Sequence, residues 1–137
     1  MVNDIIKALS VTLYENFEGV NIYVDNVEQG FETPAFFIYN VESMEDRLLG
    51  NRAKRTNLFD IHYFSKTETT EEIQQVASKL YTLLRQIKLL NGSSINGFKL
   101  KHEVDEKVLH FFVQYNHIVL HPSEAPEIFG ELDYNFK

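Results

Sequence analysis

The stretch Ala35–Phe64, AFFIYNVESMEDRLLGNRAKRTNLFDIHYF, decides how this chain is expected to fold. Its two ends, AFFIYNVE and NLFDIHYF, are rich in aromatic and β-branched residues, which is typical of β-strands. Gly50-Asn51 is the best turn signal between them. The segment Ser43–Thr56 has too few apolar residues to be buried. We therefore predict a long β-hairpin whose distal half projects beyond the core.

Two segments flanking the hairpin carry apolar residues at every third or fourth position, which predicts an amphipathic helix in each. In the first, Asn3 is the expected N-cap, and Gly19 is placed to end the helix. Its apolar positions are Val2, Ile5, Ile6, Leu9, Leu13 and Phe17. The second is expected to open with a capping box of Thr69 and Glu72 and to stop at residues 91–97. Its apolar face comprises Ile73, Val76, Ala77, Leu80, Leu83, Leu84 and Ile87.

Three further segments alternate between apolar and polar residues, as half-buried strands do. In residues 20–24 and 98–104 the even positions are mostly apolar, and in residues 108–120 the odd positions are. The expected order is therefore helix, three strands, helix, two strands, in which short turns favour antiparallel pairing. We predict one α+β domain over residues 1–122, with a mainly antiparallel sheet, both helices packed on one face, and a C-terminal tail over residues 123–137.

The composition of the 137 residues limits the function classes. Twenty acidic residues against thirteen basic ones give a formal net charge of −7, which argues against general affinity for nucleic-acid phosphates. The absence of cysteine excludes thiol nucleophiles, disulfides and cysteine-ligated metals. No apolar run approaches the roughly 18 residues of a membrane helix. The N-terminus lacks the basic region and the small-residue cleavage site of a signal peptide.

Asp60 and His62 are the best candidates for acid–base chemistry. They stand two positions apart on a predicted strand and hence on one face, and a carboxylate that orients an imidazole suits a general base. Neither a cysteine nor a serine in a GxSxG-type turn supplies a nucleophile. The favoured interpretation is a polar pair on a sheet face that solvent or another subunit covers. A small hydrolase using this pair is the distant alternative.

The other histidines do not predict a metal site. His117 and His121 are four positions apart on a strand, about 13 Å at the usual rise per residue, which is too far to share one ion. His102 and His110 could meet across the last hairpin, but no third ligand is evident. The phosphate-binding patterns GxxxxGK[ST] and GxGxxG are also absent. We therefore expect no catalytic, cofactor-binding or metal-binding residue in this chain.

One group of basic residues stands out in this acidic chain. Four of the thirteen basic residues fall within nine positions around the predicted hairpin turn, which makes them its expected exposed tip. We predict that this tip contacts protein, and not substrate. The residues of this predicted interface are Arg47, Gly50, Asn51, Arg52, Lys54 and Arg55.

Three stretches together resemble the tail terminator proteins of bacteriophages and prophages of Gram-positive bacteria. They are IYVDNVEQGFETPAFFI (Ile22–Ile38), LLGNRAKRTNLFDIHYF (Leu48–Phe64) and VLHFFVQYN (Val108–Asn116). None of them is a chemical signature, and the resemblance lies in their order, their spacing and the matching chain length. It extends from the NDIIKALS segment near the N-terminus to about Pro122.

The resemblance implies a structural virion protein without catalytic activity or cofactor. Members of this class typically form a hexameric ring on the head-proximal end of a completed tail tube, stop tube polymerisation and present a surface to the head connector. The implied partners are further copies of the chain, the tail tube protein, the head–tail connector or stopper, and a sheath protein if the tail is contractile. DNA passes through the channel without specific binding, and no membrane takes part.

The same resemblance implies assembly in the cytoplasm of the bacterial host and a final place in the virion, at the head-proximal end of the tail. The alternative is another head–tail completion or connector protein, of a phage or of a phage-derived tail-like particle.

Overall fold

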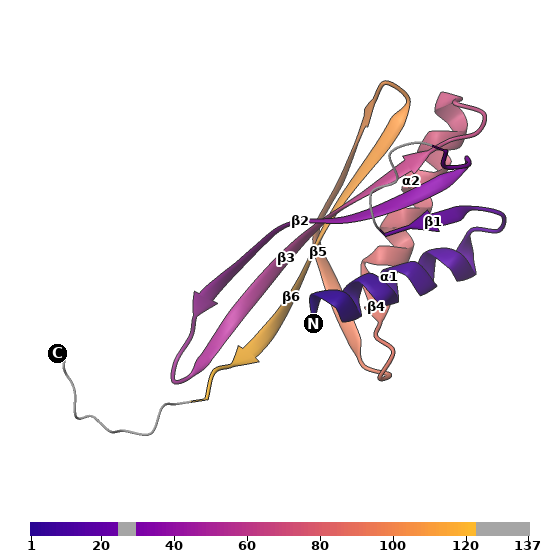
Figure 1. The fold of residues 1–137 in the computed structure, drawn as a ribbon. Coiled ribbons are helices and arrows are strands. Elements are labelled where there is room, and N and C mark those ends of the chain that lie inside the picture. Colours follow the sequence, from indigo (N-terminus) through magenta and orange to yellow (C-terminus); the bar gives the residue numbers. More distant parts are fainter. Residues whose placement is uncertain (25–29, 123–137) are drawn as a thin grey trace.

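The computed structural model of the chain describes residues 1–24 and 30–122, which form two helices and six strands (Figure 1). In chain order these are α1 Val2–Asn16, β1 Asn21–Tyr23, β2 Ala35–Arg47, β3 Arg52–Phe64, α2 Thr70–Leu84, β4 Gln86–Lys88, β5 Ser94–Asp105 and β6 Val108–Leu120. The predicted C-terminal tail, residues 123–137, lies outside the described residues.

The strands form one sheet in the order β1-β2-β3-β6-β5-β4. All neighbouring pairs are antiparallel except β1 and β2, which run parallel with Asn21 opposite Ala35. The two helices and the mainly antiparallel sheet are compatible with the predicted α+β class, and the parallel pairing of β1 with β2 is the exception. The connection between Tyr23 and Ala35 is long enough to carry the chain back to the end of the sheet from which β1 starts.

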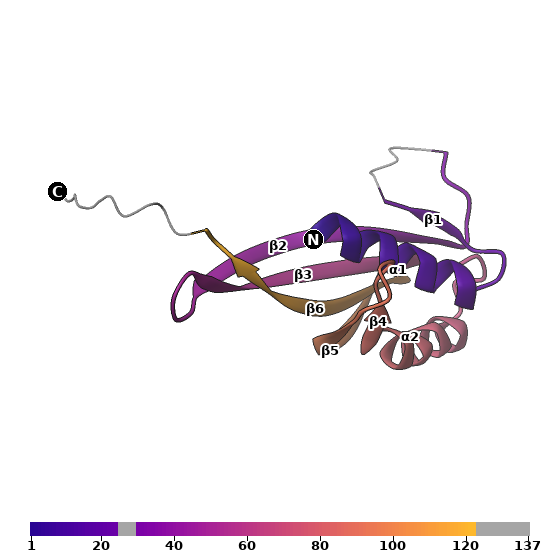
Figure 2. The ribbon, with the colours of Figure 1, turned by 90° about the horizontal axis from the view of Figure 1, so that it is seen from below.

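The hydrophobic core lies between the helices and one face of the sheet. The odd-numbered residues of β3 from Phe59 to Tyr63 and of β6 from Leu109 to Tyr115 point into it, with the alternation predicted for β6, and Ile61 stands opposite Phe111. The buried faces of α1 and α2 belong to the same core cluster. Figures 1 and 2 both show the helices beside one half of the sheet, while the joined ends of β2 and β3 extend away from them.

The predicted start of α1 is wrong, and the capping of α2 is only partly as predicted. Helix α1 begins at Val2, with Met1 and not Asn3 at the N-cap position, and no side chain caps it. Helix α2 has half of the predicted capping box, because the Glu72 N–H donates to Thr69 Oγ1 at 3.3 Å. The Glu72 carboxylate instead accepts hydrogen bonds from Tyr63 Oη at 2.6 Å and from Ser65 Oγ. It therefore ties the start of α2 to the end of β3.

The end of the second helix also differs from the prediction. Helix α2 stops at Leu84, and Ile87, predicted to belong to its apolar face, lies in the short strand β4. Ile87 is still buried, opposite Ile95 of β5. A buried position in a short strand and one on a helix face both require an apolar residue, which is why the periodicity did not separate them.

Strand β5 departs from its predicted alternation at a bulge. The register with β6 shifts between Phe98 and Lys101, and Lys99 has a positive φ of 55°. One extra residue in a strand inverts which side chains face the core beyond it. Leu100 consequently packs against the core, whereas Phe98, expected on the same face, is exposed.

Candidate functional site

The part of β2 and β3 nearest their connection is almost devoid of core. Every residue of β2 from Asn40 to Arg47 is exposed, although its pairing with β3 continues to Arg47 opposite Ala53. Beyond the apolar core, this end holds a polar network around the fully buried Asn57 and, nearer the turn, the buried Ala53. The Asn57 amide oxygen accepts from Ser43 Oγ at 2.9 Å, and its Nδ2 donates to the Tyr115 carbonyl at 3.2 Å. We call the part of the sheet between this network and the turn the distal sheet. It comprises Met44–Arg47 of β2, Arg52–Thr56 of β3 and Asn116–Leu120 of β6.

The structure divides the predicted basic tip between the two faces of the distal sheet. Cross-strand partners share a face, and consecutive residues alternate between faces. Arg55 stands opposite Glu45 and Arg47 opposite Ala53, so these two arginines lie on the face that continues the core side. Arg52 and Lys54 lie on the other face, while Gly50 and Asn51 are exposed in the connecting turn.

On the core-side face, Arg55 is held by an acidic partner within the chain. Its Nη2 and Nε donate to Glu45 Oε1 at 2.6 and 3.0 Å. His121 Nε2 lies 2.8 Å from the other carboxylate oxygen of Glu45, and the His121 N–H donates to the Asn51 carbonyl at 2.7 Å. The hydrogen bond from Arg55, followed by that from His121, lowers the pKa of Glu45 below its ordinary value. The cluster of Arg55, Glu45 and His121 fastens the end of β6 to the turn.

The opposite face of the distal sheet combines cations with exposed apolar side chains. Arg52 stands beside Leu120, and Lys54 stands beside Ile118. Met44, on β2, lies on the same face, and all three apolar side chains are about half exposed or more. Exposed apolar residues gathered among charges are characteristic of surfaces that contact another protein.

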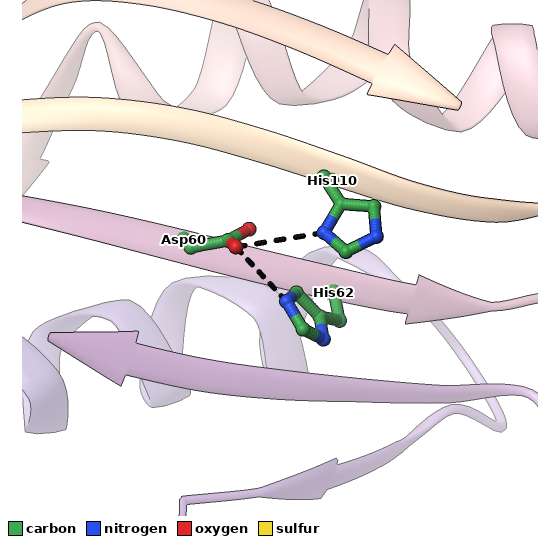
Figure 3. Close-up of side chains that lie close together, drawn as sticks. All are labelled: Asp60, His62 and His110. Carbon is green, nitrogen blue, oxygen red and sulfur yellow. Dashed lines mark hydrogen bonds and ion pairs between the residues drawn. The ribbon is translucent and has the colours of Figure 1, made fainter. Parts of the chain in front are cut away.

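A second cluster lies at the middle of the sheet, on the face turned away from both helices. Asp60 and His62 come from β3, and His110 comes from β6 directly opposite His62 (Figure 3). His62 Nε2 is 2.9 Å from Asp60 Oδ2, and His110 Nδ1 is 3.5 Å from the same oxygen. The two imidazole rings have centroids 4.2 Å apart. We call these three residues the Asp–His–His cluster.

Aromatic rings shield the Asp–His–His cluster on the β2 side. The Tyr39 ring packs on His62 at 4.7 Å between centroids, and Phe37 stacks beside Tyr39 at 6.2 Å. Burial, followed by the negative charge of Asp60, raises the pKa of the Tyr39 hydroxyl. The Asp60 side chain is only 12% exposed, and its Oδ1 is buried without a hydrogen-bond partner among the described residues.

The sequence placed Asp60 and His62 together but did not find His110. The sequence left open a contact between His110 and His102. The residue opposite His110 on β5 is Glu103, so the two histidines face opposite sides of the sheet. His102 instead contacts Tyr81 Oη at 2.8 Å and Gln74 Oε1 at 3.1 Å. The neighbour relation of β3 and β6 brings His110 to His62, and no local pattern carries that information.

The two remaining histidines have partners of their own. His117 Nδ1 lies 3.2 Å from Asn57 Nδ2, and His121 contacts Glu45. Burial, the N-terminal amine and Arg55 together lower the pKa of His117.

The chain was compared with models of known protein families. A family model described as phage tail terminator protein matches residues 4–127. No curated protein matches the chain significantly. Among the described residues, neither helix has the length and apolar character needed to cross a membrane.

Proposed function

The chain belongs to the phage tail terminator family, and on that premise we propose that it forms a ring on the head-proximal end of the tail tube. The ring ends polymerisation of the tube protein and offers its other side to the head connector. The match over residues 4–127 carries the proposal, since it covers α1 from its third residue, all of α2 and the six strands of the described residues. The family makes the chain a structural component of the phage tail.

Open strand edges support assembly with further copies of the chain. Strand β1 pairs only with Ala35–Phe37 of β2, so the rest of the outer edge of β2 has no neighbouring strand among the described residues. At the opposite side of the sheet, β4 pairs only with Ser94–Asn96 of β5. Exposed edges of this length favour pairing with another chain, and a closed ring covers them without leaving a free end.

The face of the distal sheet that bears Arg52 and Lys54 is the proposed contact with a tail partner. Its exposed Met44, Ile118 and Leu120 supply apolar area. Arg52 and Lys54, the latter opposite Asp46 of β2, add cations that suit an acidic surface. Of the predicted interface, Arg55 is the least suited to this role because Glu45 already binds it. Arg47, Gly50 and Asn51, at the end of the hairpin, remain proposed members of the interface.

Two alternative functions, a head–tail connector and a hydrolase, have weaker support. A head–tail connector or stopper would use the same surfaces with different neighbours, and it differs in what it binds and not in chemistry. A hydrolase would depend on Asp60 and His62, whose hydrogen bond gives acid–base geometry alone. The family match favours a structural role over a catalytic one.

Electron microscopy of particles assembled with and without the protein tests the proposed role. We expect tails of abnormal length, or tails without heads, in its absence. The double variant Arg52→Glu, Lys54→Glu should reduce joining of heads to tails at least tenfold, with a larger loss at higher salt. The double variant Lys7→Glu, Lys66→Glu makes an equal change of charge at two exposed positions outside the distal sheet, and as the matched control it should assemble normally. Tails of normal length that join heads without the protein would refute the terminator role.

A further inference from the structure

We propose that Asp60, His62 and His110 form a binding site for a divalent transition-metal ion of the zinc class. The inference concerns the monomer and does not rest on the proposed place in the tail. The three donor atoms, one from each side chain, lie within 4.8 Å of one another. The site joins two neighbouring strands in the best-packed part of the sheet, where the backbone beneath them is fixed by the core.

The spacing of the donors fits tetrahedral coordination. Around a zinc ion with bonds of about 2.0–2.2 Å to nitrogen and oxygen, ligand atoms lie roughly 3.3 Å apart. Asp60 Oδ2 is 2.9 Å from His62 Nε2 and 3.5 Å from His110 Nδ1, one distance on each side of that value. A small outward rotation of the His62 ring therefore opens the space for an ion. Figure 3 shows both rings turned toward the carboxylate.

The carboxylate of Asp60 supplies a second, independent observation. Its Oδ1 is buried and accepts no hydrogen bond from the described residues. A buried carboxylate oxygen without a donor is unfavourable, and a cation bound to the carboxylate offsets the uncompensated charge. The histidines cannot reach Oδ1 as they stand, because both contact Oδ2.

The donor set selects the class of ion. Two imidazole nitrogens and one carboxylate oxygen suit Zn²⁺, Co²⁺ and Ni²⁺, whereas Mg²⁺ and Ca²⁺ prefer oxygen ligands throughout. Three protein ligands leave one position of a tetrahedral ion for water. The rings of Tyr39 and Phe37 limit solvent on one side, which strengthens the bonds to the ion.

Binding of the ion changes which ring nitrogen of each histidine carries the hydrogen. Without an ion, the histidine nitrogens that face Asp60 Oδ2 can hold it only by donating an N–H, since an ionised carboxylate has no hydrogen to give. To ligate the ion, His62 Nε2 and His110 Nδ1 must each present a lone pair. Each neutral ring therefore carries its remaining hydrogen on the other ring nitrogen when the ion is bound.

Titration of the chelator-treated full-length protein tests the site. Isothermal calorimetry with Zn²⁺ should give one site per chain, and Co²⁺ should produce the visible absorption of tetrahedral coordination. At about 100 times the dissociation constant, Zn²⁺ should raise Tm by on the order of 8 °C, while Mg²⁺ at the same concentration should not.

Variants locate the binding. Asp60→Asn and His110→Gln should each weaken Zn²⁺ binding at least tenfold, while His121→Gln, which removes an exposed histidine that contacts Glu45, should leave it unchanged. Circular dichroism establishes that each variant is folded, and His110→Gln decides the matter if the buried Asp60→Asn is not. The absence of saturable Zn²⁺ binding by the wild type would overturn the proposal. Equal binding by all variants, or loss in His121→Gln alone, would overturn it as well.

Discussion

The hydroxyl of Tyr115 offers a sharp test of how helix α2 is held against the sheet. Tyr115 is fully buried in β6, and its Oη donates to the carbonyl of Leu84 at 2.7 Å. Leu84 is the last residue of α2, and the last carbonyls of a helix have no partner within it. Tyr115→Phe keeps the ring but removes this donor. The lost hydrogen bond and the buried carbonyl together should lower the free energy of unfolding by about 2 kcal/mol.

For a domain of this size, about 2 kcal/mol corresponds to a fall in Tm of roughly 6–10 °C, which differential scanning calorimetry resolves readily. Tyr14→Phe is the matched control, because the Tyr14 side chain is largely exposed on α1. It should change Tm by less than about 2 °C. An equally small change in Tm for Tyr115→Phe would refute the reasoning, because the hydrogen bond to the Leu84 carbonyl would then contribute little to stability.

Two further predictions concern Gly97, which packs against the end of α2, and His117, which contacts Asn57. Gly97→Ala should lower the free energy of unfolding by about 2 kcal/mol, because the new Cβ would lie 2.5 Å from the Leu84 carbonyl oxygen and 2.9 Å from Val113 Cγ2. Urea denaturation measures this loss, and an unchanged midpoint would contradict the close approach. The lowered pKa of His117 predicts a stability that is complete above its ordinary pKa of 6.5 and decreases as the pH falls below it, since the unfolded chain then binds the proton more readily. Between pH 7.5 and pH 5 the Tm of the wild type should therefore fall more than the Tm of His117→Gln. An equal fall in both proteins would refute the prediction.

The sheet can be divided into two parts according to what stabilises each. Beside the helices, apolar side chains fill the core, and beyond Asn57 the strands are held by backbone pairing and polar contacts. Surface ion pairs such as Arg55 with Glu45 contribute little stability, about 0–1 kcal/mol. The distal sheet therefore has fewer buried apolar contacts to stabilise it than the part of the sheet beside the helices.

The sequence by itself determined the elements with strong periodicity and clear end signals. Helix α2 starts after Thr69 as its capping residue predicts, and the odd residues of β6 from Leu109 to Tyr115 are buried. The proportions of apolar residues in β2 and β3 placed the core at one end of both strands. These features depend on interactions between residues close in sequence, or on a simple division between buried and exposed positions, so that a local pattern records them.

Only the tertiary structure decided which side chains meet. The pairing of β3 with β6 brought His110 to Asp60 and His62 and created a cluster that the sequence did not reveal. Strand alternation likewise separated Arg52 from Arg55, although the sequence showed one basic group. Strand order and register are set by the joint packing of the whole core, and a shift of one residue exchanges the faces. Contacts across a sheet are therefore fixed by long-range packing, which a local pattern does not contain.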